Sequence, residues 1–137
     1  MAQKQLEFFL SMEPPTVTDQ EHRIGIRNDG KPYIYKPREL MEARTKLAEA
    51  LAMYIPQDKL NGPLRLTVKW LFPKGKHNHA QWKVTKPDTD NLNKMLKDVM
   101  TALRFWTDDA QVCSEIIEKF WSNVPGIYIK VEALEDD

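Results

Sequence analysis

The apolar residues of this chain follow two different spacings, which together predict a fold of strands and helices. The clearest strand covers residues 64–72, where apolar and polar side chains alternate as they do along a strand with one buried face. Its apolar positions are Leu64, Leu66, Val68, Trp70 and Phe72. Arg65, Thr67 and Lys69 lie between them, so the other face of this strand is expected to be polar and basic.

Two segments have the spacing of an amphipathic helix, with apolar residues three or four positions apart. The first covers residues 38–55, because Pro37 suits the start of a helix and Pro56 ends it. The second begins at Asp88 or Thr89 and extends to Arg104. The two apolar stripes are Leu40, Ala43, Leu47, Leu51 and Tyr54 in the first helix, and Leu92, Leu96, Val99 and Leu103 in the second.

The segment before the first helix predicts three strands. Residues 5–10 are rich in aromatic and aliphatic side chains, which favour a strand. Pro14 and Pro15 then require an extended or looped segment. Residues 22–27 and 33–36 flank an Asn-Asp-Gly sequence, which favours the tight turn of a hairpin.

The segment after the second helix predicts a turn at residues 105–111 and two more strands, at 112–121 and 127–134. We expect these two strands to pair through the short turn between them, which contains a Pro-Gly pair. The full order is β-β-β-α-β-α-β-β, with a loop at 73–87. It predicts a single α+β domain over residues 1–137, with two main helices packed on a mixed, mainly antiparallel β-sheet.

The composition favours a soluble protein inside a cell. Cys113 is the only cysteine, so no disulfide can form within the chain. No apolar stretch reaches the roughly 20 residues that a membrane-spanning helix needs. The N-terminal segment lacks the apolar length and the cleavage site of a signal peptide. We therefore expect a cytoplasmic protein with no membrane partner.

The 20 basic and 20 acidic residues cancel, but they are separated along the chain. Residues 62–87 contain six basic residues and no acidic one, and residues 23–38 contain five basic residues and one acidic one. Such blocks can form a surface that binds phosphate, although lysines of strands and loops are often simply solvated. The candidates for DNA contacts are Arg23, Arg27, Lys69, Lys74, Lys76, Lys83 and Lys86.

The most informative acidic residues are Asp88, Asp90 and Asp109. The first two lie where a loop becomes a helix, and Asp109 lies in the turn after that helix. Mg²⁺ prefers carboxylate ligands and completes its shell with water and phosphate. We therefore predict that the three aspartates bind Mg²⁺ for phosphodiester hydrolysis. Lys94 would neutralise the charge that builds up on the phosphate.

The same residues also have an ordinary structural interpretation. Asp88 suits the N-cap of a helix, and Asp90 with Lys94 forms an i,i+4 pair that is common on exposed helices. An EF-hand loop is excluded because Leu92 occupies the position of its third ligand. A zinc site is disfavoured because its possible ligands lack a standard spacing: His77, His79 and Cys113.

A longer pattern is more specific than the aspartates alone. Lys86-Pro-Asp-Thr-Asp-Asn-Leu-Asn-Lys94, then Asp98, then Phe105-Trp-Thr-Asp-Asp-Ala-Gln-Val112, resembles the RusA family of Holliday-junction resolvases. The two motifs are joined by a helix, and their spacing agrees with the family pattern. Pro14-Pro15-Thr16 resembles the family's early proline motif more weakly. The chain departs from the pattern after these prolines, where many members carry an asparagine.

The resemblance implies an α+β homodimer that cleaves four-way DNA junctions with Mg²⁺ or Mn²⁺ in a bacterial host cell, often encoded by a phage or prophage. It implies that Asp88, Asp90 and Asp109 bind the metal and that Lys94 is the catalytic lysine. Two roles remain open for Asp108: it either supports the metal ligands without binding the metal itself, or stabilises the turn. We expect a structural role for Asp98. Trp82 has two possible roles: it stacks on an unpaired base, or it is buried in the core or in a dimer contact.

Two other functions are compatible with these residues. A non-catalytic module would bind branched DNA without needing Lys94. A phosphohydrolase acting on nucleotides would use the same carboxylates and would turn over mononucleotides in the absence of DNA.

Overall fold

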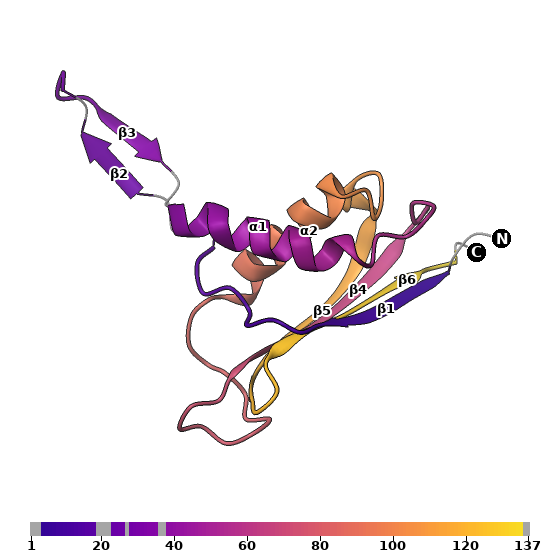
Figure 1. The fold of residues 1–137 in the computed structure, drawn as a ribbon. Helices are drawn as coiled ribbons and strands as arrows, with labels where there is room; N and C mark the ends of the chain where they lie inside the picture. Colours follow the sequence, from indigo (N-terminus) through magenta and orange to yellow (C-terminus); the bar gives the residue numbers. More distant parts are fainter. Residues whose placement is uncertain (1–3, 19–22, 27, 36–37, 136–137) are drawn as a thin grey trace.

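The computed structural model describes residues 4–18, 23–26, 28–35 and 38–135, and it has the element order that the sequence predicts. The elements are β1 Gln5–Leu10, β2 Arg23–Ile26, β3 Pro32–Tyr35, α1 Arg38–Ala52, β4 Leu64–Pro73, α2 Thr89–Ala102, the 3-10 helix η1 Asp109–Gln111, β5 Val112–Ser122 and β6 Gly126–Ala133 (Figure 1). The prediction of an α+β fold is therefore confirmed.

The main sheet has four strands in the order β1-β6-β4-β5. β6 pairs antiparallel with both β1 and β4, whereas β4 and β5 run parallel, so the predicted mixed, mainly antiparallel sheet is confirmed. β2 and β3 form the predicted antiparallel hairpin as a separate two-stranded sheet.

The predicted pairing of the last two strands is wrong, because β5 and β6 lie on opposite sides of β4. The four-residue step from Ser122 to Gly126 can span roughly 13 Å when extended. Two strand spacings amount to only about 10 Å, so this connection can pass over the end of β4. β4 has alternate side chains that are fully buried, and its central position gives it a hydrogen-bonded neighbour on both edges.

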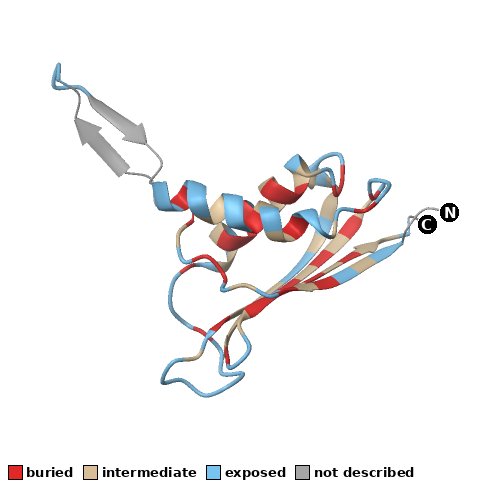
Figure 2. Cartoon of the chain, in the orientation of Figure 1, coloured by how far each residue is buried: buried red, intermediate tan, exposed pale blue. Residues whose placement is uncertain are grey.

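Both helices pack on one face of the main sheet (Figure 1). Residues of both helices and of the sheet strands are buried (Figure 2) and together form one core cluster. The predicted apolar positions of β4 are all buried, as are most of the helical stripes. Three stripe residues are only partly buried: Ala43, Tyr54 and Leu103. Phe105 and Trp106, in the turn after α2, are also buried and belong to the core.

Both helices end earlier than predicted. α1 ends at Ala52, and the N–H of Tyr54 donates to the carbonyl oxygen of Leu51 in a tight final turn. α2 ends at Ala102, and Arg104 has a φ of 69°, in the left-handed region, where a helix cannot continue. No helix in the described ranges is both long and apolar enough to span a membrane.

Candidate functional site

Asp88 and Asp90 lie at the start of α2 and both are exposed. Asp88 has the extended backbone of an N-cap residue, with φ −72° and ψ 149°, but its side chain makes no capping hydrogen bond. Asp90 accepts a hydrogen bond from the N–H of Asn91 through Oδ1, at 3.0 Å. Because the carboxylate of Asp88 makes no capping hydrogen bond, it is available to an external ligand. The N-terminus of a helix also favours negative charge and bound phosphate.

Lys94 is exposed one turn further along α2. Within the described part of the chain its ammonium has neither an ion-pair nor a hydrogen-bond partner, so the ordinary i,i+4 pair with Asp90 is not formed. An unpaired ammonium on the same helix as two exposed carboxylates can contact a phosphate group that those carboxylates approach through a metal ion. This arrangement fits the catalytic interpretation better than the structural one.

The segment that leads into α2 is held by a lysine of the sheet. Lys119 on β5 donates hydrogen bonds to the carbonyl oxygens of Thr85 and Pro87, both at 2.7 Å. The N–H of Lys83 also donates to the carbonyl oxygen of Lys119, at 3.1 Å. These bonds fix the backbone immediately before Asp88.

Lys83 supports the same segment from inside. Lys83 is only 8% exposed, and its ammonium donates a hydrogen bond to the hydroxyl of Thr85 at 2.6 Å. The ammonium also lies 4.2 Å from the centre of the Trp121 ring. Burial, and secondarily the charge of Lys119, lower the pKa of Lys83. Lys83 was among the expected DNA contacts, but the structure places it inside the molecule, apart from the exposed lysines.

Asp109 lies toward the other end of α2. The helix runs antiparallel to β5: Lys119 meets Pro87 at its start, Glu115 meets Asn93 and Lys97 near its middle, and η1 precedes the first residue of β5. In Figure 1 the turn between α2 and β5 lies at the end of the helix opposite to the 73–87 loop. Fourteen helical residues rise by roughly 21 Å.

One chain therefore does not gather the predicted metal ligands. In the ranges that the structure describes, which include Asp88, Asp90 and Asp109, there is no group of three or more acidic, histidine or cysteine side chains arranged to hold a metal ion. The donor chemistry of Asp88 and Asp90 suits a hard divalent cation. Two carboxylates on one turn provide part of such a site.

Asp108 has a structural role in the turn. Its carboxylate accepts a hydrogen bond from the N–H of Ala110 at 2.9 Å, while the side chain of Gln111 accepts from the N–H of Asp108 at 3.1 Å. This reciprocal capping box fixes η1. Asp98 is partly buried on α2.

The polar contact between α2 and β5 is not among the features predicted from the sequence. Asn93 is 5% exposed, and its Nδ2 donates to Glu115 at 2.8 Å. Lys97 donates to the other carboxylate oxygen of Glu115 at 2.6 Å. A signal was present, because Asn93 lies three residues before Leu96 and therefore borders the buried stripe. Lys119 offered no comparable signal, since its partners lie more than thirty residues away.

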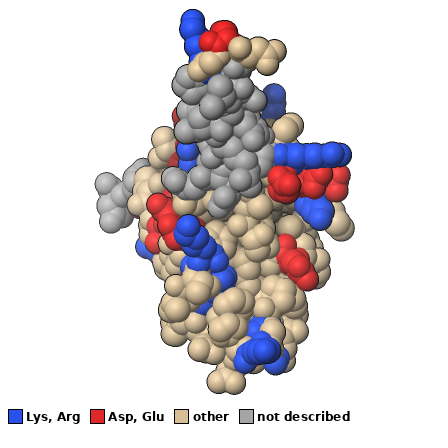
Figure 3. All heavy atoms as spheres, turned by 90° about the vertical axis from the view of Figure 1, so that its left-hand side faces the viewer, with Lys and Arg blue, Asp and Glu red and all other residues tan. Residues whose placement is uncertain are grey.

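The remaining basic candidates are spread over loop and strand. Lys76, Lys86 and Lys69 are exposed, and Lys74 is partly exposed. At the lower end of the molecule, where the 73–87 loop lies in Figure 1, the charged side chains visible in Figure 3 are basic. The side chain of Arg23 and the whole of Arg27 lie outside the described residues.

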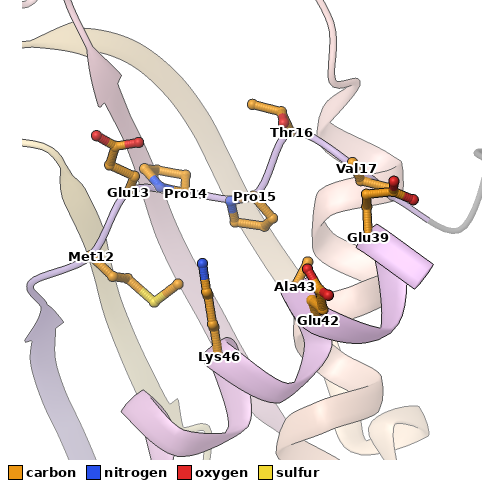
Figure 4. Close-up of a pocket in the computed structure, with 10 residues that line it drawn as sticks. All are labelled: Met12, Glu13, Pro14, Pro15, Thr16, Val17, Glu39, Glu42, Ala43 and Lys46. Carbon is orange, nitrogen blue, oxygen red and sulfur yellow. The ribbon is translucent and has the colours of Figure 1, made fainter. Parts of the chain in front are cut away.

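A cavity of about 230 Å³ lies elsewhere, between the residues after β1 and helix α1 (Figure 4). Glu13, Glu39 and Glu42 line it, and Lys46 points from α1 toward the Met12–Pro15 segment. This excess of carboxylates disfavours phosphate. The cavity contains none of the predicted catalytic residues.

A family model described as Endodeoxyribonuclease RusA matches residues 14–132. The match includes the Pro14-Pro15 pair, the loop and start of α2, and the turn that contains Asp109. The chain belongs to the RusA family. The resemblance predicted from the two acidic motifs is therefore confirmed.

The chain is also similar to two relatives, and the name of the first agrees with this assignment. A Lactococcus phage r1t protein, the crossover junction endodeoxyribonuclease rusA, is 47% identical over 53 residues, which cover 38% of this chain and 40% of the phage protein. The uncharacterized protein YqaN of Bacillus subtilis (strain 168) is 28% identical over an alignment of 138 positions, which covers 92% of this chain and 94% of that protein.

Proposed function

We propose that this protein is a metal-dependent endonuclease that resolves four-way DNA junctions by phosphodiester hydrolysis. The observation that carries the proposal is the start of α2, where Asp88, Asp90 and Lys94 are exposed and Lys94 is unpaired among the described residues. Membership of an endodeoxyribonuclease family supports DNA hydrolysis. The printed name of the phage relative supports a crossover junction as the substrate.

Asp88, Asp90 and Asp109 are the proposed metal ligands, and Mg²⁺ or Mn²⁺ fits their oxygen donors. Such a cation would supply Lewis acidity toward the phosphoryl oxygen and lower the pKa of an attacking water. Lys94 would contact the phosphate and offset the negative charge that develops during hydrolysis. The Thr85–Pro87 backbone, held by Lys119, would keep Asp88 in position while DNA binds.

We propose that the active form is a homodimer. Asp109 lies toward the opposite end of α2 from Asp88 and Asp90, so a complete set of three ligands requires Asp109 from a second copy or a rearrangement of the chain. A two-fold dimer would supply two such sites. A four-way junction presents two equivalent strands, and two symmetric sites suit paired cuts.

The exposed lysines of the 73–87 loop and β4 would bind the DNA backbone. Lys74, Lys76 and Lys86 belong to a loop without acidic residues that leads directly to Asp88. Contacts of this kind neutralise phosphates and make binding weaker as salt concentration rises. The name of the phage relative supports action on DNA, and the sources of the two relatives, a Lactococcus phage and Bacillus subtilis, support action inside a bacterial cell.

The test is a cleavage assay on four-way, flap and linear duplex DNA in Mg²⁺, Mn²⁺ and Ca²⁺. We expect the parent protein to cut the four-way junction in Mg²⁺ or Mn²⁺. Asp90→Asn should bind the junction with little change in Kd but lose cutting by at least about a hundredfold, a loss typical of an essential catalytic group. Absence of junction and flap cleavage in both Mg²⁺ and Mn²⁺ would contradict the proposal.

Two other outcomes point to different functions. Junction binding that is insensitive to Lys94→Met, without cutting, would indicate a DNA-binding module. Hydrolysis of mononucleotides without DNA would indicate a phosphohydrolase.

A further inference from the structure

Trp82 is a large aromatic residue on the surface of a basic loop. Its exposed fraction is 59%, and Val84, two residues further, is 90% exposed. Trp82 and Val84 therefore present apolar surface to water, and a patch of exposed apolar side chains commonly marks a binding site. Neither the metal site nor the core accounts for this side chain.

The indole of Trp82 is supported from one side. Its ring lies 4.4 Å from the ring of Phe120 on β5, centre to centre, with a tilt of 31° between the planes. Because Trp82 remains mostly exposed, the contact with Phe120 leaves room for a second planar group. A nucleobase is such a group, and stacking on an aromatic side chain is tolerant of its sequence.

The backbone around Trp82 is also fixed. Gln81 accepts a hydrogen bond from the N–H of Trp121 at 2.8 Å, and the N–H of Lys83 donates to Lys119 at 3.1 Å. Trp82 and Phe120 form an antiparallel bridge between these two bonds. The loop is thus attached to the edge of β5, and the indole is presented on an ordered backbone. A preordered platform loses less conformational entropy when it binds a ligand.

The position of Trp82 connects it with the proposed site. Trp82 and Asp88 are six residues apart, and Lys119 bonds to the backbone beside each of them, at Lys83 and at Pro87. A base stacked on Trp82 would therefore lie near the phosphates that reach the start of α2. The loop is rich in lysine and contains no acidic residue.

The charge of the loop favours DNA over a second copy of the chain as the occupant. The cores of protein interfaces are depleted in lysine, whereas Lys74, Lys76 and Lys86 belong to the same loop as Trp82. Two copies of this loop facing each other would bring like charges together. Polyanionic DNA is complementary to both the charge and the aromatic ring.

We propose that Trp82 is a stacking platform for an unpaired base at the branch point, and that it contributes to the selection of branched over linear DNA. The inference rests on the proposed function in so far as DNA is the substrate. Paired bases inside a linear duplex are already stacked and are not available to the indole. Bases at a branch point are more easily opened, so the contact favours the junction.

The experiment compares the parent protein, residues 1–137, with Trp82→Ala, Trp82→Phe and Val124→Ala. Val124 is the matched control because it has the same exposed fraction, 59%, and lies in the turn between β5 and β6. The Kd for a synthetic four-way junction and for a linear duplex of the same sequence is measured in Ca²⁺. Sedimentation velocity of each variant reports its oligomeric state, and the cleavage assay in Mg²⁺ is performed in parallel.

We expect Trp82→Ala to raise the junction Kd about tenfold, the effect of losing one stacked base, and to change the duplex Kd less than twofold. Trp82→Phe should lie closer to the parent, and Val124→Ala should match it. An unchanged ratio of junction to duplex Kd in Trp82→Ala would overturn the inference. A lower sedimentation coefficient for Trp82→Ala than for the parent would also overturn the inference, because it would show that the variant is a smaller oligomer and that Trp82 lies between copies of the chain.

The two proposals fail separately. If the parent cuts junctions and the Kd ratio is unaffected by Trp82→Ala, the stacking role fails and the endonuclease stands. If the parent binds junctions through Trp82 but cuts no DNA in Mg²⁺ or Mn²⁺, the endonuclease fails and the stacking role stands.

Discussion

The ammonium of Lys119 on β5 donates a hydrogen bond of 2.7 Å to the carbonyl oxygen of Pro87, the residue immediately before Asp88. A second bond of the same length goes to the carbonyl oxygen of Thr85. The sheet is thereby connected directly to the backbone that presents Asp88. Lys119 is a positioning residue in this arrangement, because it acts on Asp88 through the chain.

Replacing Lys119 by Met should impair cleavage more than binding. The variant loses two charge-assisted hydrogen bonds, which should lower the free energy of unfolding by about 1–3 kcal/mol. Asp88 loses its fixed position, so we expect single-turnover junction cleavage to fall at least about tenfold, while the junction Kd changes less than threefold. Urea unfolding, single-turnover kinetics and a binding titration measure the three quantities.

Lys130→Met is the control for this substitution. It removes the same charge from a residue whose ion pair with Glu132 is loose, at 3.9 Å, and partly exposed. Its effect on unfolding should stay below about 1 kcal/mol. If Lys119→Met loses stability but cleaves at the parental rate, the positioning role of Lys119 is refuted.

A mixture of two inactive variants tests whether Asp109 completes the site of a second copy. Asp90→Asn and Asp109→Asn should each abolish cleavage alone. After the two are unfolded and refolded together, half of the dimers would be mixed, and one of the two sites in each would have all three aspartates. About a quarter of all sites in the mixture would then be active, so we expect the cleavage rate to return to about a quarter of the parental rate, mainly as single nicks. If all three ligands come from one chain, the mixture stays inactive.

The parts of the fold that depend on local spacing could be predicted from the sequence. The stripe of α2, with Leu92 and Leu96 buried, follows directly from its helical period. The order of strands depends on pairing between distant segments, and a short turn after Ser122 gave no indication that β4 separates β5 from β6. Loop length alone did not distinguish a hairpin from a connection across one strand.

The same distinction applies to the candidate site. Asp88 and Asp90 lie at the start of α2 and Lys94 lies one turn further along, so their exposure on one element follows from residue spacing. The position of Asp109 depends on the direction in which α2 crosses β5, which no short motif specifies. The role of Lys119 likewise depends on the way the 73–87 loop returns to the edge of the sheet.

Glu115 should be important for stability because it satisfies a buried amide. It accepts a hydrogen bond from Asn93 at 2.8 Å, and the Oδ1 of Asn93 is buried without a partner among the described residues. Glu115→Ala would leave the whole amide unpaired, which should cost about 1–3 kcal/mol in urea unfolding. Glu118→Ala, a partly buried position on the same strand, is the control and should cost less than about 0.5 kcal/mol, the usual limit for surface positions. Equal costs for the two variants would contradict this role of Glu115.

Gly126 begins β6 where β1 passes very close. A Cβ at this position would lie 2.0 Å from Cζ of Phe9 and 2.7 Å from the carbonyl oxygen of Leu10. The Phe9 ring can move, but the Leu10 oxygen belongs to the paired backbone of β1. We expect Gly126→Ala to lower the free energy of unfolding by about 1–3 kcal/mol, whereas exposed Val124→Ala should change it by less than about 0.5 kcal/mol. Parental stability of Gly126→Ala in urea would show that β1 does not approach so closely.

Tyr128 on β6 should make stability sensitive to alkaline pH. Its hydroxyl donates a hydrogen bond to the carboxylate of Glu7 on β1, and this bond, followed by burial, raises the pKa of Tyr128 from 10.0 to about 12. A raised pKa means that the folded protein retains the proton longer than the unfolded chain does. The associated stability is therefore fully present below pH 10 and is lost as the pH rises toward 12.

Tyr128→Phe removes this titration and provides the comparison. We expect the parent to have the higher Tm at pH 8, by a small margin because the pair is exposed, and the difference to shrink between pH 10 and pH 12. The lowered pKa of Lys83 acts in the opposite direction, since its folded state gains stability as the pH rises, but it is common to both proteins and cancels in the difference. Thermal unfolding of both proteins across this range measures the effect, and a Tm difference that stays constant from pH 8 to pH 12 would show that Tyr128 and Glu7 are not coupled.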